Sequence, residues 1–418
     1  MKTVLWFSNC MQSNGKNKDS GSWLFSMAQL LVSTRKIHLI NITTIRGKSI
    51  NNIEHHFINE YFDEYLLPVW PLDKNGIPSA ENCSKIKDLC IECSPNIIHV
   101  WGVENYYSKI VPLLNLNIPT LLEIQGIRST CAEVYYGDLS IRETLQCFGL
   151  REILFPFMKS IYKEKSIMRS QGNSDDEVIR LYKHISTQSG WIRDHIRAIN
   201  SKTTIYKTSI SIREEFWKAD KWVYNNKDFY CSAGGPFPYK SIQTAIRALS
   251  VVVREYPETK LYVIGNFLDS TCFHQSGYLT FIKNLTKKLN LVDNVIFTGP
   301  LFANEIIDIM HKCVGMVQTS YVESYSLAVA EAMCVGIPSI ISYAGAMPEL
   351  AQNRISGLFY TPGDYIACAS RMIELIENRI LAEFISDNAR KLAFERNNDE
   401  SVLNAQINIY KQLIEDII

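Results

Sequence analysis

The sequence lacks an excess of charge of either sign. Its 418 residues include 43 Lys plus Arg and 43 Asp plus Glu, so the formal net charge is zero. General nucleic-acid binders carry a basic excess, and we therefore expect no nucleic-acid partner. Apolar residues at 46% and charged residues at 21% are ordinary globular values and argue against wholesale disorder. At roughly 100–200 residues per domain, the length indicates two or three domains.

Long hydrophobic runs are also missing. The apolar run near the N-terminus, Thr3–Ser8, is too short for the apolar region of a signal peptide. The longest stretch of small apolar residues, Ala328–Ala346, is interrupted by Glu331, Gly336 and Pro338 and cannot be a transmembrane helix. We expect a cytoplasmic protein, and leave open a peripheral contact with the inner membrane face.

The chain has no paired cysteine framework. It contains 11 Cys, an odd number spread from Cys10 to Cys368, which fits a reducing compartment better than a secreted disulfide scaffold. Cys90 and Cys93 are spaced as zinc ligands, but no second pair follows at a matching spacing. We interpret both as small apolar residues of a helix that ends near Pro95, and expect no metal site.

Short β-branched, apolar runs alternate with helical patterns along the whole chain. The expected strands are Thr3–Ser8, Lys36–Ile42, Asn96–Val100, Thr120–Ile124, Lys183–Gln188, Thr203–Tyr206, Asp228–Ser232, Lys260–Ile264, Asn294–Phe297, Gly315–Thr319, Ser339–Ser342 and Gly357–Tyr360. This α/β alternation, repeated twice, predicts two Rossmann-like, doubly wound domains with largely parallel sheets. We expect the domains to face each other across a cleft.

A polar and aromatic segment, Ser211–Lys227, marks the expected domain boundary. The first domain then spans residues 1–210 and the second spans residues 211–395. Residues 396–418 carry only a helical pattern, and such a terminal helix could pack back on the first domain.

A helical insertion of the first domain is expected at about residues 127–180, because no strand pattern occurs there. Within it, residues 141–170 mix apolar side chains such as Phe155 and Ile161 with basic ones such as Lys163 and Arg169. A basic amphipathic segment can lie on an anionic membrane. The alternative is a cover over the core of the first domain.

Polar residues gather after the expected strand Gly315–Thr319. Ser324 is a good N-cap, so a helix should begin near Tyr325 and leave Glu323 on the strand-end loop. The backbone N–H groups of Tyr325, Ser326 and Leu327 would then face an anion. Glu331, two turns into the helix, is suited to accept hydrogen bonds from a ribose diol.

A second strand-end loop supplies positive charge and glycine. Gly234 and Gly235 permit a close backbone approach, and Lys240 stands near a helix start, where the helix dipole disfavours a cation. A lysine there makes sense when a diphosphate occupies the space; the alternative is a solvated surface lysine. The loop after the first strand, which includes Gly21 and Ser22, lacks the G-x-G-x-x-G pattern of dinucleotide-binding domains.

These motifs, in this order, resemble the retaining glycosyltransferases of family four (glycosyl transferases group 1), which have the two-domain GT-B fold. The resemblance is carried by the E-x7-E pair Glu323 and Glu331, by Gly345–Glu349, by Asn294–Pro300 and by the glycine-rich loop that ends at Lys240. It covers most of Ser211–Phe394 well. In the first domain it is looser and depends on Pro95–Gly102.

The resemblance implies transfer of a sugar from a nucleotide-diphosphate donor, with UDP favoured over GDP, and with retained anomeric configuration and no cofactor or essential metal. It implies that Lys240 balances the charge of the leaving diphosphate, an electrostatic task that is usually a large catalytic contribution. Glu323 would hold hydroxyls of the donor sugar and Glu331 the ribose. Gly21 and Ser22 would bring backbone N–H groups near the phosphates.

The acceptor implied is a glycan or lipid-linked saccharide, as in the synthesis of bacterial surface polysaccharide, with peripheral membrane contact through residues 141–170. No carboxylate for a covalent glycosyl-enzyme is evident, which favours same-face attack assisted by a phosphate oxygen of the leaving group.

Three positions depart from the family pattern. Gly235 stands where many members have an arginine, Ala346 replaces the second glycine of a pair, and Gln125 stands where many have a histidine. His99 is interpreted as a packed strand residue. The first departure leaves an alternative open, an inactive GT-B module that binds nucleotide sugars. A nicotinamide-dependent oxidoreductase is a further alternative, but no fingerprint glycines support it.

Overall fold

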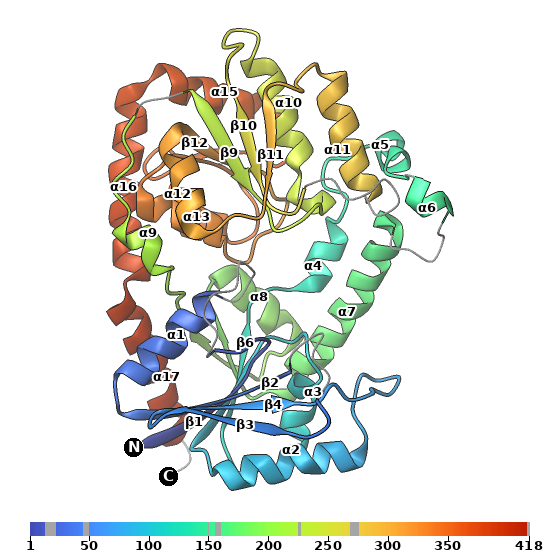
Figure 1. Cartoon of the computed structure of the whole chain (residues 1–418), viewed down its shortest axis with the longest axis vertical. Helices are drawn as coiled ribbons and strands as arrows, with labels where there is room; N and C mark the ends of the chain where they lie inside the picture. Colours follow the sequence, from blue (N-terminus) through green and yellow to red (C-terminus); the bar gives the residue numbers. More distant parts are fainter. Residues whose placement is uncertain are drawn as a thin grey trace. The chain divides into compact units, whose positions relative to one another are not determined.

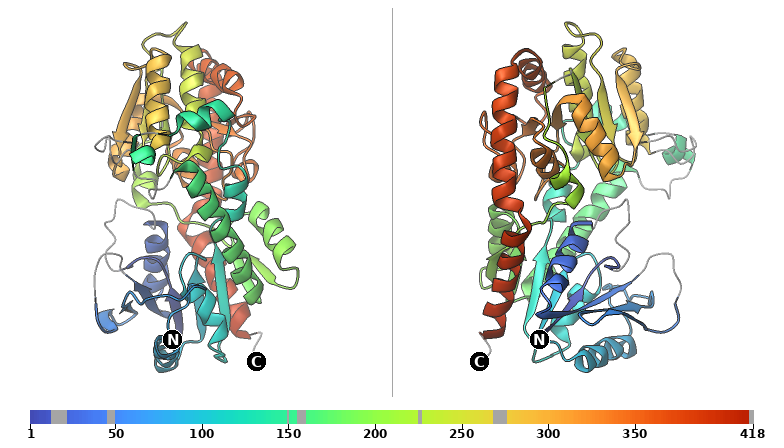
Figure 2. Two further views of the ribbon diagram at one scale, coloured as in Figure 1. Left: turned by 90° about the vertical axis from the view of Figure 1, so that its right-hand side faces the viewer. Right: turned by 60° about the vertical axis from the view of Figure 1, so that its left-hand side comes forward.

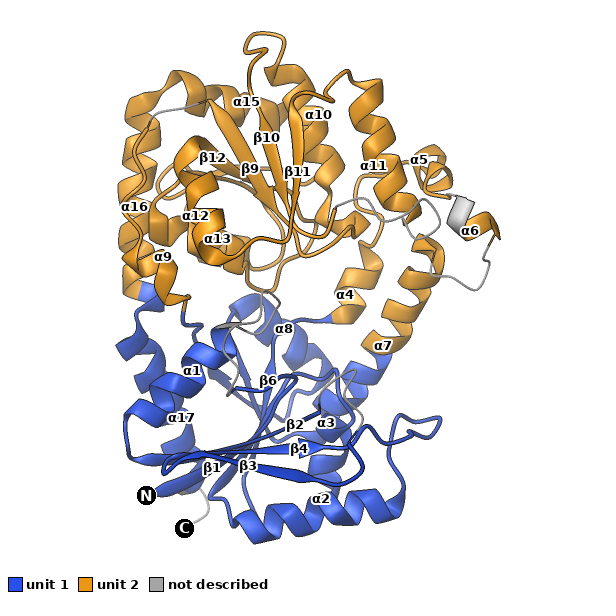
Figure 3. Ribbon diagram, in the orientation of Figure 1, with its two compact units in different colours: residues 1–127, 173–211, 396–418 blue, residues 128–172, 212–395 orange. Residues whose placement is uncertain are grey.

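A computed structural model of the chain describes residues 1–12, 22–44, 50–148, 150–154, 160–224, 227–267 and 276–415. It divides into two compact units, coloured separately in Figure 3. Unit 1 comprises residues 1–127, 173–211 and 396–418, and unit 2 comprises residues 128–172 and 212–395. Residues 128–172, which are most of the expected insertion of the first domain, therefore belong to unit 2.

Unit 1 contains strands on both sides of the insertion and the last helix of the chain (Figure 1). Its elements are β1 (Lys2–Phe7), α1 (Ser22–Ser33), β2 (Ile37–Thr44), β3 (Glu54–Asn59), β4 (Phe62–Leu67), α2 (Ala80–Cys93), β5 (Ile97–Trp101), α3 (Tyr107–Ile110), the 3₁₀ turn η1 (Val111–Leu113), β6 (Thr120–Ile124), β7 (His184–Thr187), α8 (Gly190–Ile199), β8 (Thr204–Lys207) and α17 (Asp399–Glu415). Helix α7 (Ile161–Leu181) begins in unit 2 and ends in unit 1.

Unit 2 contains the remaining elements. They are α4 (Arg128–Glu133), α5 (Ile141–Gln146), α6 (Leu150–Leu154), α9 (Glu214–Lys218), β9 (Asp228–Ser232), the 3₁₀ turn η2 (Pro238–Lys240), α10 (Ile242–Val252), β10 (Leu261–Ile264), α11 (Gly277–Lys288), β11 (Val295–Gly299), α12 (Ala303–Lys312), β12 (Cys313–Gln318), α13 (Leu327–Val335), β13 (Ser339–Ser342), α14 (Met347–Leu350), β14 (Leu358–Tyr360), α15 (Tyr365–Glu377) and α16 (Arg379–Asn397).

The sheet of unit 2 has the strand order β11-β10-β9-β12-β13-β14, and every pair is parallel. Strands β12 and β13 are buried along their whole length, as expected when helices cover both faces of a parallel sheet. The order of connection reverses between β9 and β12. In open α/β sheets ligands bind beyond the carboxyl ends of the strands at this reversal.

The sheet of unit 1 has the order β3-β4-β2-β1-β5-β6-β7-β8 and is parallel except for β3 and β4, which pair antiparallel. All twelve predicted strands are confirmed in the two sheets, whereas β3 and β4 were not predicted. The first of these is an edge strand whose side chains are mostly exposed, so it carries no apolar alternation to recognise. Helix α17 packs on α1 and β5 (Figure 2).

The two interpretations of single residues in unit 1 are confirmed. Cys90 is buried in α2, which ends at Cys93, and Cys93 is partly buried. His99 is fully buried in β5, where its Nδ1 lies 2.8 Å from the Tyr410 hydroxyl of α17. Burial lowers the pKa of His99 well below its ordinary value, so the imidazole is neutral.

Glu123 is a buried carboxyl of unit 1. It lies in β6, is fully buried, and accepts hydrogen bonds from the Ser186 hydroxyl and the Gln188 side-chain amide. Burial raises the pKa of Glu123 to about 8, although the bond from Ser186 lowers it. The folded protein therefore retains a proton that the unfolded chain loses above its ordinary pKa of 4.5.

We expect the folded state to lose stability as the pH rises from 5 to 8, by about 1 kcal/mol per pH unit from this one group. Glu123→Gln mimics the protonated carboxyl. We expect it to remove this pH dependence of stability and, at pH 8, to unfold at a higher urea concentration than the parent. Urea unfolding at pH 5, 6, 7 and 8 measures both effects. Glu60→Gln, at an exposed position, is the control and should keep the parental slope. An unchanged slope in Glu123→Gln would contradict the assignment.

Within the described residues, no helix combines the length and apolar content needed to cross a bilayer. The segment expected at a membrane exposes large apolar side chains in α5, in α6 and at Phe148 between them. They are Ile141 at 83%, Leu145 at 60%, Phe148 at 43%, Ile153 at 67% and Leu154 at 54% exposure. Phe155, which contributed to the prediction, lies outside the described residues.

Candidate active site

Lys240 and Glu323 meet where the connections of the unit 2 sheet reverse. Lys240 ends the loop that follows β9, and Glu323 lies on the loop that follows β12. The Lys240 Nζ atom lies 2.6 Å from Glu323 Oε1, and these side chains are 23% and 13% exposed. The structure thus brings together the two residues predicted for catalysis, and places a cation and a carboxylate in partial shelter from solvent.

The carboxylate of Glu323 is held through one of its oxygens. Oε1 accepts hydrogen bonds from Lys240 Nζ, from the Ser320 hydroxyl at 2.7 Å and from Gln318 Nε2 at 3.2 Å. Among the described residues none donates to Oε2. An oxygen with spare hydrogen-bonding capacity beside a fixed one is suited to accept a substrate hydroxyl.

The backbone around Lys240 is tied to the β12 loop. The carbonyl of Lys240 accepts a hydrogen bond of 2.7 Å from the Thr319 hydroxyl, and the N–H of Tyr321 donates to the carbonyl of Tyr239 at 2.8 Å. These bonds join the two loops on either side of the ion pair. The distance between Lys240 and Glu323 is therefore set by backbone as well as by side chains.

Gly345 supports Glu323 from the loop after β13. The glycine has φ +54°, and a Cβ built on it would lie 2.2 Å from the carbonyl oxygen of Glu323. Its neighbour Ala346 donates its N–H to the same carbonyl at 2.8 Å. Ala346 has φ −82° and ψ 4°, a conformation that needs no glycine, so only the first residue of the predicted glycine pair must lack a side chain.

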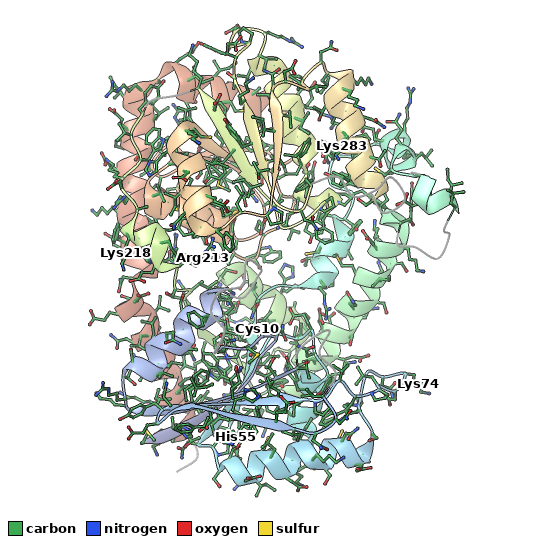
Figure 4. The ribbon with its side chains drawn as sticks, viewed as in Figure 1. Cys10, His55, Lys74, Arg213, Lys218 and Lys283 are labelled. Carbon is green, nitrogen blue, oxygen red and sulfur yellow. The ribbon has the colours of Figure 1, made fainter. Side chains whose placement is uncertain are left out.

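Glu331 lies in α13 and forms an ion pair with Arg213. Arg213, which is labelled in Figure 4, precedes α9. Arg213 Nε and Nη2 lie 2.9 and 2.7 Å from Glu331 Oε1, and the Glu331 side chain is 10% exposed. None of the described residues donates to Oε2. Burial raises the pKa of Glu331 above its ordinary value, and the Arg213 guanidinium offsets part of this rise. Arg213 was not predicted as a site residue.

Helix α13 begins later than predicted. Its N-cap is Ser326, whose hydroxyl accepts from the N–H of Val329, and Leu327 is the first helical residue. The prediction that Ser324 caps the helix is wrong; Ser324 and Tyr325 remain in the loop. The helix begins there because the Ser326 hydroxyl and carbonyl accept hydrogen bonds from the N–H groups of Val329 and Ala330, respectively. The N–H groups at the helix start therefore begin at Leu327.

The glycine-rich loop leaves open space. A Cβ on Gly234 would meet no atom within 4 Å, while one on Gly235 would lie 3.2 Å from the Phe237 ring. Gly234 therefore offers room for close approach by a ligand. Of the two residues predicted in unit 1, Gly21 lies outside the described residues. Ser22 is the first residue of α1, and its side chain is not described.

Within the part of the chain that the structure describes, no cluster of three or more His, Cys, Asp or Glu side chains is placed to hold a metal ion. The charged groups of the site are instead the two carboxylates, Lys240 and Arg213. Chemically, this arrangement can bind anionic and polyhydroxylated parts of one ligand.

Comparison with known proteins finds similarity to one family over part of the chain. Residues 213–392 match the family model of glycosyl transferases group 1. N-acetyl-alpha-D-glucosaminyl L-malate synthase of Bacillus anthracis is 25% identical over 177 residues, 42% of this chain and 43% of that relative. O-antigen chain mannosyltransferase RfbU of Salmonella typhimurium is 21% identical over 271 residues, 63% of this chain and 67% of the relative. The chain therefore matches less than half of the length of the first of these relatives.

Similar solved structures cover the whole chain. Sucrose-phosphate synthase from Thermosynechococcus elongatus has a TM-score of 0.74 at 15% identity, and 100% of each chain is covered. Anabaena Alr3699/HepE in complex with UDP-glucose has a TM-score of 0.65 at 13% identity, with 99% of this chain and 100% of that chain covered. The predicted α/β GT-B fold is confirmed.

Proposed function

We propose that this protein is a retaining glycosyltransferase that transfers a sugar from a nucleotide-diphosphate sugar to a glycan or lipid-linked saccharide. The observation that carries the proposal is the Lys240–Glu323 pair, 2.6 Å apart where the strand connections of unit 2 reverse. It lies within the residues that match glycosyl transferases group 1. A cation and a carboxylate with a spare oxygen fit the two halves of a sugar diphosphate.

The proposed roles follow from the contacts of each side chain. Lys240 would leave Glu323 in part and neutralise the diphosphate, because a dianion competes well for an ammonium group. Glu323 would use Oε2 for a hydroxyl of the donor sugar. Glu331, with one oxygen bound by Arg213, would use the other for the ribose. The first N–H groups of α13 and the open backbone at Gly234 would contact phosphate oxygens.

The proposed reaction conserves charge and protons. The bond between the anomeric carbon and the diphosphate oxygen breaks, and a bond to the acceptor hydroxyl oxygen forms on the same face of the sugar. The proton of that hydroxyl passes to the leaving phosphate oxygen, so no further base is needed. Lys240 would stabilise the negative charge that develops on the diphosphate, where a preorganised cation is most effective.

UDP is the proposed nucleotide and surface polysaccharide the proposed product class. HepE, a structural neighbour, was solved with UDP and glucose, and RfbU is named for transfer to an O-antigen chain. Both properties belong to those proteins, and they support the same kind of donor and acceptor here.

A thermal-shift screen of UDP, GDP and ADP with their glucose conjugates tests the proposal, because a ligand at 100 times its Kd stabilises the fold by about 2.7 kcal/mol. We expect stabilisation by UDP compounds and slow release of UDP from the UDP-sugar. Stabilisation without any turnover would support the alternative, an inactive GT-B module. No response to any nucleotide would overturn both.

The exposed apolar side chains of α5 and α6 support a peripheral membrane contact through residues 141–170, which would bring a lipid-linked acceptor close to the enzyme. Co-sedimentation with vesicles of phosphatidylcholine and phosphatidylglycerol tests this contact. Binding that survives replacement of both Ile141 and Leu145 by Asp would exclude it.

Arg213 is proposed to keep Glu331 ionised for the ribose. In Arg213→Gln the offsetting charge is lost, the pKa of Glu331 rises further, and its carboxylate is lost as the pH falls. We expect the affinity for UDP to fall more steeply between pH 8 and pH 6 in this variant than in the parent, because the parent keeps the Glu331 carboxylate ionised to lower pH. Calorimetric titration with UDP measures it.

Two further variants make the test specific to charge. Arg213→Lys retains the cation and is expected to keep the parental pH profile, although it loses one hydrogen bond. Glu331→Gln should bind UDP weakly at every pH, since no carboxylate remains to titrate. A parental profile in Arg213→Gln would show that Arg213 does not control the charge of Glu331.

A further inference from the structure

A turn of the insertion lies directly on the loop that carries Lys240. Gly137, between α4 and α5, has φ +57°, and a Cβ there would lie 3.1 Å from the Pro238 carbonyl and 3.3 Å from the Tyr321 ring. Two residues earlier, the Tyr135 ring packs on Tyr239 at a centroid distance of 5.9 Å. Residues 128–138 therefore form part of the surroundings of the candidate active site in unit 2.

Asp138, at the end of this turn, receives hydrogen bonds from the beginning of α10. Its Oδ1 accepts from the Ser241 hydroxyl at 2.6 Å and from Gln243 Nε2 at 2.5 Å, and its Oδ2 accepts from the Thr244 hydroxyl at 3.2 Å. Arg247 Nη1 lies 2.6 Å from Oδ2, and the Asp138 side chain is 11% exposed. The anion at the N-terminus of α10 is thus a side chain of the protein itself.

Ser241 links this carboxylate to the candidate active site. It follows Lys240 directly, is fully buried, and has the left-handed conformation with φ 52° and ψ 44°. This conformation costs a residue with a Cβ about 1 kcal/mol or more, and it persists only when its surroundings hold it. The Ser241 side chain makes no capping bond to α10 and bonds instead to Asp138 and Thr244.

Lys240 is consequently fixed on both sides. Its carbonyl is bound by Thr319, its ammonium group by Glu323, and the residue after it by Asp138. If Ser241 relaxed to a right-handed conformation, the chain direction at Lys240 would change and the ammonium group would move. A displacement of about 1 Å at a catalytic group can cost about 10²-fold in rate.

We propose that Asp138 is a positioning residue for Lys240, and that the insertion is thereby a working part of the donor site. The inference rests on the proposed function, because Lys240 has its role only if a nucleotide diphosphate binds there. It assigns a role to a segment whose expected functions were to cover the first domain or to contact a membrane.

A double-mutant cycle separates positioning from general stability. Asp138→Asn retains the size of the side chain and removes its charge. In the parent background we expect it to lower kcat/KM for UDP release from UDP-glucose, and the affinity for UDP, by about 10-fold or more. In a Lys240→Ala background the same change should alter both quantities less than threefold, because the group it positions is gone. An equal loss in both backgrounds would overturn the proposal.

Glu143→Gln is the matched control. Glu143 accepts from Arg247 Nη2 at 2.5 Å but makes no bond to Ser241, and glutamine keeps the capping role of this residue at α5. We expect parental kinetics. If Asp138→Asn fails to fold, Ser241→Ala removes the same hydrogen bond. It then replaces Asp138→Asn in the double-mutant cycle, and an equal loss in both backgrounds would again overturn the proposal. Failure of the proposed function is distinct, since the unmodified protein would then neither bind UDP nor release it from UDP-glucose.

Discussion

Replacing Lys240 with alanine is expected to lower kcat/KM for sugar transfer by about 10²- to 10³-fold, the usual cost of losing one preorganised group that stabilises developing charge. Most of the loss should appear in kcat, because the charge on the leaving diphosphate is greatest in the transition state. In the parent, Lys240 Nζ lies 2.6 Å from Glu323 Oε1 and neutralises this carboxylate. Without Lys240 the carboxylate would repel the phosphates of the donor. Initial rates of UDP release over a range of UDP-sugar concentrations separate kcat from KM.

Two variants accompany this measurement. Lys288→Ala removes an exposed lysine at the end of α11 and should leave the rates unchanged. Lys240→Arg retains the charge but not the compact geometry of an ammonium group, and should recover only part of the activity. If Lys240→Ala retains activity within threefold of the parent, the assignment of Lys240 is wrong even though the GT-B fold stands.

Replacing Gly345 with alanine is expected to destabilise unit 2 by about 3 kcal/mol or more, because overpacking and an unfavourable positive φ add. The new Cβ would lie 2.2 Å from the Glu323 carbonyl oxygen, and a backbone atom cannot rotate away as a flexible side chain can. Relief of this clash must move the Glu323 backbone, so we expect activity to fall at least 10²-fold even at temperatures where the variant is folded. Thermal unfolding and UDP release at 15 °C measure the two effects separately.

Gly234→Ala is the matched comparison for stability. Its Cβ would meet no atom within 4 Å, and its φ does not lie in the left-handed region, so its unfolding temperature should equal that of the parent within the error. The same variant should bind UDP more weakly if a phosphate approaches the backbone there. A stable and active Gly345→Ala would show that the loop after β13 adapts and does not support Glu323.

The parts of the site that could be predicted depend on local sequence. The strands β9 and β12 are largely apolar, and the loops that follow them carry Lys240 and Glu323. The carboxyl ends of parallel strands lie at one edge of a sheet. Those facts suffice to expect that the two residues meet. They do not decide between neighbouring caps: Ser324 and Ser326 are equally good N-cap residues by type, and only the structure shows that Ser326 caps the helix.

By itself the sequence determined the twelve predicted strands, the two α/β halves and the loops that bear Lys240, Glu323 and Glu331, because periodicity and strand ends are local properties. The partners of those residues were decided only by the tertiary structure. Arg213 reaches Glu331 across 118 residues, and Asp138 reaches Ser241 across 103 residues. Contacts over such separations have no characteristic spacing in the sequence, because only the tertiary fold brings the distant segments together. The neutral balance of charge likewise gave no sign of these ion pairs.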